Sequence, residues 1–473
     1  MKVENINVAA AIEKARDLLE KDKTLSPAVA ATMQLLITIV TILLNQKNLN
    51  SQNSSKPPSQ DPNRKKKTRK DKGLKRGKRK PGGQSGHPGA TLDPVPKPDE
   101  IEEILIDRRT LPQGQYIHVG FENRQVFDVD ISMKVKEYRG EILENQKGAQ
   151  WLACFPAGVN NPTQYGNGVK SQSVYMSQFQ LIPQLRVTDF FNDQVGLPLS
   201  KASVQNFNRE AYRRLELFEG WAKRILLDSP LNFSDETGVN VNGNQFWFHV
   251  LSNEKVALFQ VDEKRGADAM DRMGILPHYK GILCHDHWKP YYTYDCVHSL
   301  CNAHHLRELQ RAWEQDEQRW AFLMKKLLNE INEEVKKSDK GKLSKDRIEF
   351  YQKRYRTLLS QGEKGCPAAP RNGSRGRTKQ SKSRNLLDRL REFEEDTLRF
   401  MKNPIVPFTN NHAENDLRMT KVQQKISGCF RSIEGARVFC RIRSYLVTCR
   451  KNGVNPTEAL RMLFDGKLPA FVT

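Results

Sequence analysis

The sequence predicts an α/β fold for the second half of the chain, and three features lead to this prediction. Two short apolar runs, Leu231–Phe233 and Gly281–Cys284, have the length and composition of buried strands. Asn242-Gly243 is a strong two-residue hairpin turn between strand-like segments. A strand at Val256–Val261 and a short helix at Ala267–Met273 are expected before the second apolar run. The order strand, hairpin, strand, helix, strand is that of a ribonuclease-H-like fold.

Each apolar run leads into an aspartate. On a strand, alternate residues share one face, and both runs place two apolar anchors and then an acid on that face. The two sets are Leu231, Phe233, Asp235 and Ile282, Cys284, Asp286. If the two strands are neighbours, Asp235 and Asp286 meet at the carboxyl end of the sheet, where open α/β folds place their sites.

A third acid, Glu414, lies in Asn410–Arg418, which has the pattern of a helix start. Two strand aspartates and one helix glutamate outline a site for divalent metal ions. Mg²⁺ prefers oxygen ligands, and two Mg²⁺ ions ~3.5–4 Å apart can activate a nucleophile and stabilise the leaving oxygen of a phosphodiester. Asp235, Asp286 and Glu414 are therefore the expected metal ligands and catalytic residues. Glu236 is a weaker candidate because it points to the opposite face of its strand.

Four runs of residues, in this order along the chain, resemble the signature blocks of bacterial DDE transposases of the insertion-sequence-66 family. They are Asp235–Gly238 (DETG), Asp286–Tyr291 (DHWKPY), Cys301–Leu309 (CNAHHLREL) and Asn410–Glu414 (NNHAE). One such block would be a weak signal, but four in order are a strong one, and the resemblance covers nearly the whole chain.

The resemblance implies a transposase that binds the ends of its mobile element. It also implies metal-dependent strand cleavage and transfer by attack of a 3′-hydroxyl, on a ribonuclease-H-like core. Mg²⁺ is the implied cofactor, with Mn²⁺ able to substitute, because carboxylate oxygens suit either ion. Double-stranded DNA, both element ends and target, is the implied partner, and the implied location is the bacterial cytoplasm at the nucleoid. The need for accessory proteins of the same element is left open.

The charge balance points to the same class of partner. The chain has 473 residues and a formal net charge of +22. Asp61–Lys80 holds twelve Lys and Arg against two acids, and Lys364–Arg384 holds seven against none. Clustered basic segments indicate a polyanion such as nucleic acid. Solvated linkers would show the same composition, and both interpretations can hold together.

We expect six parts along the chain. They are an N-terminal helical or coiled-coil segment (1–50), a basic linker (51–98), a small β-rich module (99–158), a helical, helix-turn-helix-like DNA-binding region (159–226), the α/β catalytic domain (227–430) with a helical insertion at about 299–401, and a C-terminal helical segment (431–473).

The N-terminal helix carries a heptad seam. Val29, Met33, Leu36, Val40 and Leu43 recur at spacings of 4, 3, 4 and 3, which favours a coiled coil between two protomers over a helix packed on its own chain. Homodimers or higher oligomers are therefore expected. The surrounding stretch, Ala28–Leu44, is the one membrane candidate, but it lies at the short end of the range for a spanning helix, and we expect no membrane contact.

The β-rich module rests on alternating stretches at Ile101–Ile106, Gln125–Val135 and Trp151–Phe155. The family often has a four-cysteine zinc module at this place, but this segment contains only Cys154. A structural zinc site needs about four ligands, so no zinc is expected here, and a DNA-contact role for the module is in doubt.

In the helix-turn-helix-like region, Gly196 is the expected turn, Ser200 the N-cap of the second helix, and Val204 and Phe207 its inward side chains. Such patterns are degenerate, and a hairpin that only braces the catalytic domain is an equal alternative. The residues expected to contact DNA are Lys201, Ser203, Gln205 and Asn206 on this helix, and Lys289, Arg418 and Lys421 beside the acids.

Two rival functions remain. Eight Cys and His residues crowd into Cys284–His305, and four of them could hold a structural Zn²⁺ in a zinc-stabilised DNA-binding protein. Zinc is disfavoured because Cys284 lies on a buried strand and a Cys-x-x-His pair is only half a site. The eight cysteines of the chain otherwise show no regular spacing, as in reduced cytosolic proteins. A catalytically inactive DNA-binding remnant is the other rival, but it would not need all three acids.

Overall fold

The computed structural model describes residues 2–3, 6–21, 24–47, 49–50, 52–54, 61, 63, 92–129, 131–370 and 378–472. Its centre is a five-stranded mixed sheet of order β7-β6-β5-β8-β9. The strands are β5 (Leu231–Val241), β6 (Asn244–Ser252), β7 (Ala257–Asp262), β8 (Ile282–His285) and β9 (Val297–Leu300). β5, β6 and β7 form an antiparallel meander, whereas β8 and β9 run parallel to β5. The predicted mixed α/β fold is confirmed.

The turn between β5 and β6 has the backbone that its sequence demands. Asn242 and Gly243 have φ angles of 49° and 86°, the positive values of a type I′ hairpin turn. The turn fixes the register of the meander, with Asp235 opposite Val250 and Phe233 opposite Ser252.

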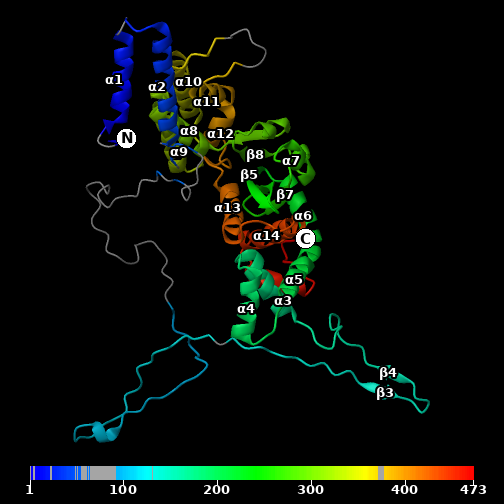
Figure 1. Ribbon diagram of the computed structural model, residues 1–473. Helices are drawn as coiled ribbons and strands as arrows, with labels where there is room; N and C mark the ends of the chain where they lie inside the picture. The colour runs from blue at the N-terminus through cyan, green and yellow to red at the C-terminus, as the bar shows by residue number, and fades with distance from the viewer. Residues whose placement is uncertain are drawn as a thin grey trace.

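Helices cover both faces of the sheet. On one face, α13 (Asn411–Ser427) and the first half of α14 (Ile433–Lys451) pack against Phe233, Phe248 and Cys284. On the other face, α6 (Glu216–Leu227) and α7 (Ala267–Met273) pack against Leu258 and Leu283. Figure 1 shows α13 and α14 beneath the sheet, with α6 and α7 beside it.

The free edge of β7 is closed by side chains of α14. The backbone N–H groups of Ala257 and Phe259 donate to the hydroxyls of Thr448 and Ser444, at 3.1 and 2.9 Å. These two hydroxyls are one helical turn apart on α14, so they match alternate residues of the strand. An edge strand with unpaired N–H groups would otherwise be open to pairing with another chain.

Between β9 and α13 the chain forms a layer of five helices with a core of its own. They are α8 (Asn302–Asp316), α9 (Arg319–Lys337), α10 (Lys345–Gly365), α11 (Lys382–Glu392) and α12 (Glu394–Lys402). Trp320, Leu327, Tyr355 and Leu387 are among the buried residues of this core. The segment expected as a helical insertion is helical, and α8 and α9 are separated at Glu317, whose φ is 54°.

The region before the sheet is helical, as expected. It contains α3 (Asn167–Val174), a short π-helical turn (Tyr175–Phe179), α4 (Gln184–Val195), α5 (Lys201–Arg214) and α6. Gly196 takes the left-handed conformation after α4, and Ser200 caps α5 by accepting from the Ser203 N–H. Val204 and Phe207 are buried. The local structure predicted for the helix-turn-helix-like segment is therefore confirmed.

The C-terminal helices are also as predicted. α14 ends before Gly453, which has a φ of 76°, and α15 (Pro456–Phe464) follows with Leu460 and Phe464 buried.

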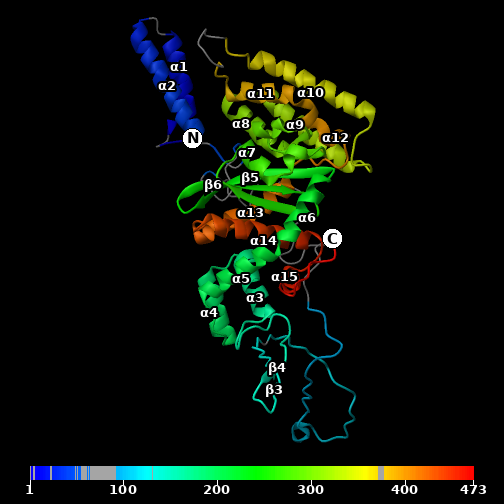
Figure 2. The same ribbon diagram turned by 90° about the vertical axis from the view of Figure 1, so that its right-hand side faces the viewer.

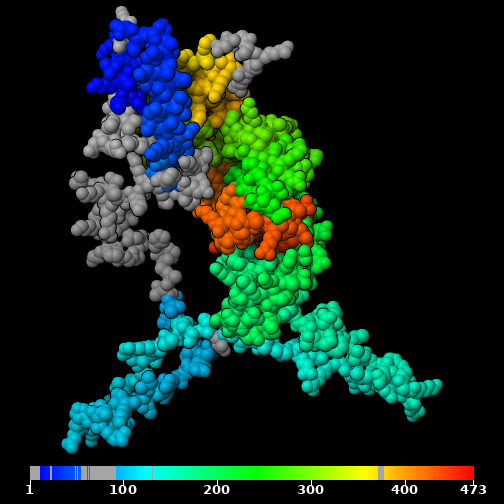
Figure 3. Space-filling view, in the orientation of Figure 1, coloured from blue at the N-terminus to red at the C-terminus, as the bar shows by residue number. Residues whose placement is uncertain are grey.

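The expected β-rich module is not present among the described residues of 99–158. The regular elements there are a 3₁₀ turn (Arg108–Thr110) and one hairpin of β3 (Ile142–Glu144) and β4 (Gln150–Leu152). The predicted strands at Ile101–Ile106 and Gln125–Val135 are wrong, although their apolar alternation is real. Most of their apolar side chains are exposed, and Val126 is 94% exposed. Figure 3 shows this segment standing away from the helical and sheet layers.

The N-terminal segment is a pair of helices, α1 (Val8–Lys21) and α2 (Pro27–Lys47), preceded by the two-residue strands β1 (Lys2–Val3) and β2 (Ile6–Asn7). All five seam residues of α2 are at least 40% exposed, whereas Ile37 and Leu44 are half-buried. By length and composition α2 is the one helix in the described chain that could cross a membrane. Most of the predicted basic linker lies outside the described residues.

Candidate active site

The sheet register brings the two predicted aspartates together. β5 and β8 are parallel, and Phe233 lies opposite Cys284. Asp235 and Asp286 each follow two residues later and lie near one another, with Asp235 inside β5 and Asp286 just after the end of β8. Phe233 and Cys284 pack toward α13, and alternation along β5 places Asp235 on that face. Glu414 stands in the first turn of α13, over the same edge of the sheet.

These carboxyl groups are crowded and little compensated. Burial, followed by the charges of Glu236, Asp286 and Glu414, raises the pKa of Asp235 well above its usual range. Burial and then the charge of Glu236 raise the pKa of Asp286 to about 6. Asp235 and Asp286 accept one backbone N–H each, from Glu236 and Trp288, both at 2.9 Å.

Within the described chain, neither aspartate forms an ion pair with Lys or Arg. Buried carboxylates that repel one another and lack a cation fit a site for a divalent metal ion, whose charge would compensate them.

Glu236 has partners of its own. Its carboxylate is 1% exposed, forms an ion pair with Arg265 at 2.6 Å and accepts the Tyr291 hydroxyl at 2.6 Å. Arg265 in turn lies against the rings of Trp288 and Trp247, 4.2 and 4.9 Å from their centroids. The expectation that Glu236 points away from Asp235 agrees with this network, which occupies both of its oxygens.

Asn410 joins the elements that carry the acids. Its side-chain amide donates to the carbonyl of Ser234, the residue before Asp235, at 2.8 Å. Its backbone N–H donates to the sulfur of Cys301 at 3.1 Å, and its carbonyl accepts the N–H of Glu414 at 3.2 Å. One buried side chain thus fixes the start of α13 relative to β5 and to the end of β9.

The carboxylate of Glu414 faces a second set of groups. Its Oε1 atom is 3.9 Å from the Cys301 sulfur and 3.9 Å from an Arg307 nitrogen. Ligand atoms of Cys301, His304 and Glu414 all lie within 4.8 Å of one another. This is the one such group of three in the part of the chain that the structure describes, and it does not include the two aspartates.

The other Cys and His residues of the crowded run are separated by the fold. Cys284 lies in the core beneath the sheet face, and His285 is buried with its Nε2 atom 3.0 Å from Nδ1 of His298. Burial is the first cause of the lowered pKa of His285, about 3, and of His287, about 3. Among the described residues, no four of them gather as a structural zinc site requires.

The predicted DNA-contacting residues lie in two places. Beside the acids, Lys289 and Arg418 are exposed, whereas the Lys421 ammonium donates to the carbonyl of Gly238 at 2.7 Å and ties α13 to β5. On α5, Lys201, Gln205 and Asn206 are exposed, and Ser203 is held by the N-cap Ser200. Figure 2 shows α5 on the far side of α14 from the sheet, so the structure does not bring the α5 residues to the acids.

Sequence reasoning missed Arg265, Tyr291 and Arg389, which lie around the acids in the structure. Arg389, on α11, lowers the pKa of Asp286 as one of the smaller contributions. Two adjacent acids, Asp235 and Glu236, on a buried strand indicate that a cation from another segment must compensate them. The sequence does not identify which Lys or Arg this is.

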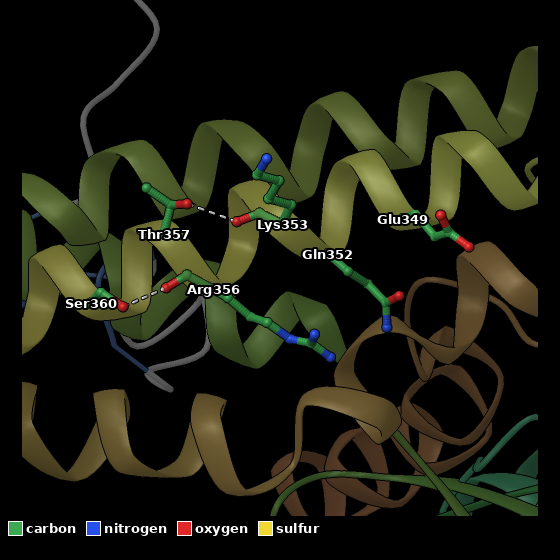
Figure 4. Close-up of a pocket in the computed structure, with 6 residues that line it drawn as sticks. All are labelled: Glu349, Gln352, Lys353, Arg356, Thr357 and Ser360. Atoms are coloured by element: carbon green, nitrogen blue, oxygen red, sulfur yellow. Dashed lines mark hydrogen bonds between the residues drawn. The ribbon is translucent and has the colours of Figure 1, made fainter.

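Two surface hollows lie away from the predicted acids. One runs along a single face of α10 and is lined by Glu349, Gln352, Lys353, Arg356, Thr357 and Ser360 (Figure 4). Another lies along the outer edge of β7, against α6 and α14. Neither contains a predicted catalytic residue.

Comparison with known proteins adds two findings. The model of a family described as "Transposase IS66 family" matches residues 162–438, which is more than half of the chain. A second family, of unknown function (DUF6444), matches residues 4–93. No curated protein matches the sequence.

The crowding of the acids predicts that removing one of them stabilises the metal-free fold. Because the pKa of Asp286 is higher in the folded state than the ~3.9 of an unfolded aspartate, its contribution to stability is greatest below pH ~4 and is lost as pH rises through about 6. Asp286→Asn, which resembles the protonated acid, should therefore gain ~1–3 kcal/mol at pH 8 and almost nothing at pH 4, measured by urea unfolding in EDTA. Asp295→Asn is the control, because that aspartate is exposed and pairs with Lys280. An equal gain at both pH values would contradict this account of the site.

Proposed function

Because the chain belongs to the IS66 family of transposases, we propose that it cleaves and joins DNA strands with divalent metal ions held by Asp235, Asp286 and Glu414. The observation that carries this proposal is that Asp235 on β5 and Asp286 just after the parallel strand β8 lie close together, with Glu414 of α13 near enough for its charge to raise the pKa of Asp235. The strand order, an antiparallel meander followed by two parallel strands, supports a ribonuclease-H-like type for the core.

Asp235 and Asp286 would hold the metal from the sheet, and Glu414 would complete the ligand set from α13. Mg²⁺, or Mn²⁺ in its place, would activate the attacking water or 3′-hydroxyl and stabilise the leaving oxygen. Asn410 positions the glutamate helix against β5, and the ion pair with Arg265 holds Glu236 in place beside the two aspartates. Lys289 and Arg418 are exposed beside the acids and would bind backbone phosphates.

Recognition of the element ends would fall to α5. Its inward residues Val204 and Phe207 are buried, so Lys201, Gln205 and Asn206 form the side that is free to enter a groove. The basic segments at 61–80 and 364–384 would add contacts to phosphates that do not depend on sequence. We expect the protein to act in the cytoplasm, where bacterial DNA lies.

Assembly would use the exposed side of α2. The seam residues Val29, Met33, Leu36, Val40 and Leu43 are all exposed, and the half-buried Ile37 and Leu44 lie next to the seam on the helix surface. Apolar side chains in a heptad pattern gain stability when a second helix covers them. A second copy of the chain is the simplest partner, because two element ends must be held together.

The catalytic assignment predicts that Asp235→Asn, Asp286→Asn and Glu414→Gln each abolish cleavage, while binding to element-end DNA stays within about twofold. Each change keeps the side-chain shape and removes a charge that Mg²⁺ needs. The measurement is strand cleavage and transfer on labelled ends, with EDTA stopping the reaction and Mg²⁺ or Mn²⁺ restoring it. Glu392→Gln, on α11, is the matched control. Near-normal cleavage by one of the three variants would remove that residue from the set.

The recognition assignment predicts that the triple variant Lys201→Ala, Gln205→Ala, Asn206→Ala binds element-end DNA at least ~10-fold more weakly. Binding to unrelated DNA should fall much less, because base contacts carry the discrimination. Gel-shift titration on both DNAs is the measurement, and Lys353→Ala, on the exposed face of α10, controls for loss of a positive charge. If the ratio of the affinities for element-end DNA and unrelated DNA is unchanged, α5 does not recognise the ends and only braces the sheet.

The assembly assignment predicts that Leu36→Lys with Val40→Lys shifts the protein toward monomer in sedimentation. The two ammonium groups would be buried in the seam, and burying them without partners is costly. Gln34→Lys adds charge at an exposed polar position of the same helix and should leave the mass unchanged. If the double variant sediments like the wild type, the seam is not the interface.

A further inference from the structure

The ends of β9 and α13 bring a thiol, an imidazole and a carboxylate together beside the acids. Cys301 precedes α8, His304 lies in the first turn of that helix, and Glu414 lies in the first turn of α13. Their ligand atoms lie within 4.8 Å of one another, and the Cys301 sulfur is 3.9 Å from Glu414 Oε1. In a tetrahedral zinc site, with bonds of ~2.0–2.3 Å, neighbouring ligand atoms are roughly 3.3–3.7 Å apart. Side-chain movements of about 1 Å would bring the three ligand atoms to these separations.

Two of the three groups have contacts that bear on this task. Cys301 is 2% exposed, and its sulfur accepts the N–H of Asn410 at 3.1 Å. Burial raises the pKa of its thiol to about 11, so a cation must displace the proton when it binds. The Nδ1 atom of His304 is buried and has no hydrogen-bond partner, which is uncommon for a buried polar atom.

Cys301, His304 and Glu414 favour a different metal ion from the one that the aspartates favour. Mg²⁺ takes oxygen ligands and gains little from a sulfur, whereas Zn²⁺ and Cd²⁺ bind thiolate and imidazole well. Three protein ligands with an open fourth position form a site that can fill and empty, unlike a closed structural site.

We propose that Cys301, His304 and Glu414 form a binding site for a thiophilic divalent cation such as Zn²⁺ or Cd²⁺, and that a cation bound there withdraws Glu414 from the magnesium site. The first part stands on the geometry of the three side chains, and the second part rests on the proposed function. The thiol proton leaves to solvent when the cation binds. Because Glu414 cannot serve both sites in one position, Zn²⁺ acts as an inhibitor that competes with Mg²⁺.

The site itself is tested without catalysis. Cd²⁺ is titrated into the metal-free full chain, and thiolate-to-cadmium charge-transfer absorption is recorded in the ultraviolet. The wild type should show a saturable band that Cys301→Ser lacks and that His304→Gln and Glu414→Gln weaken by at least about tenfold in Cd²⁺ affinity. Cys154→Ser, which removes an exposed cysteine far from the site, should keep the band. Thermal unfolding by circular dichroism checks that each variant is folded. If Cys301→Ser is unfolded, the Cd²⁺ affinity of His304→Gln decides whether the site exists. A band of the same size and affinity in the folded ligand variants would overturn the site.

The inhibition is tested on strand cleavage. Zn²⁺ should inhibit the Mg²⁺-dependent reaction of the wild type and of Cys154→Ser, and more Mg²⁺ should relieve it. Cys301→Ser should need at least about tenfold more Zn²⁺ for the same inhibition. Equal sensitivity of Cys301→Ser and wild type would overturn the competition. If the wild type shows no cleavage with Mg²⁺ alone, the proposed function fails, and the cadmium titration still decides the site.

Discussion

The structure around Asp235 depends on one constraint: several carboxylates are buried close together. Asp235, Glu236 and Asp286 lie on two adjacent strands, and Glu414 is near enough for its charge to raise the pKa of Asp235. Buried charges of one sign destabilise a fold unless cations or donors compensate them. Glu236 has an ion pair with Arg265 and a hydrogen bond from Tyr291, whereas Asp235 and Asp286 each accept a single backbone N–H. This difference in partners is the reason we propose the two aspartates, and not Glu236, as metal ligands.

The supports of the site are stiff for a physical reason. Arg265 is held between two indole rings and an ion pair, so its guanidinium has one position in which all three contacts are made. Asn410 is buried and bonded to β5 and to Cys301, which fixes the first turn of α13. Glu414 is different, because its contacts to Cys301 and Arg307 are both 3.9 Å, too long to hold it firmly. The least constrained acid is thus the one that our two proposals share between the magnesium site and the Cys301–His304 site.

The sequence predicted the neighbouring strands of Asp235 and Asp286 because the signals are local. Both strands were recognised from short apolar runs that lead into the aspartates, and β5 and β8 are adjacent and parallel in the structure. Alternation failed at Ile101–Ile106 and Gln125–Val135 for the opposite reason. A strand needs a partner edge and a surface to cover, and Ile104 and Val126 have little of either, being 83% and 94% exposed. The sequence could not predict the places of Arg265 and Arg389, because only the folded chain brings them beside Asp286. The roles of the acids and the six-part division of the chain remain predictions.

One helix links the sheet to the region proposed to recognise DNA. Through Ser444 and Thr448, α14 closes the edge of β7, and through Arg441 it pairs with Glu219 and donates to the Tyr212 carbonyl of α5. Arg443, buried between these layers, donates to the carbonyl of Phe179 at the end of the π-helical turn. Because these bonds come from a single rigid element, α5 cannot shift relative to β7 without breaking several of them at once. The distance between DNA held on α5 and the acids at the sheet edge would therefore be set by α14, and the freedom needed to bring two ends together must lie in other segments.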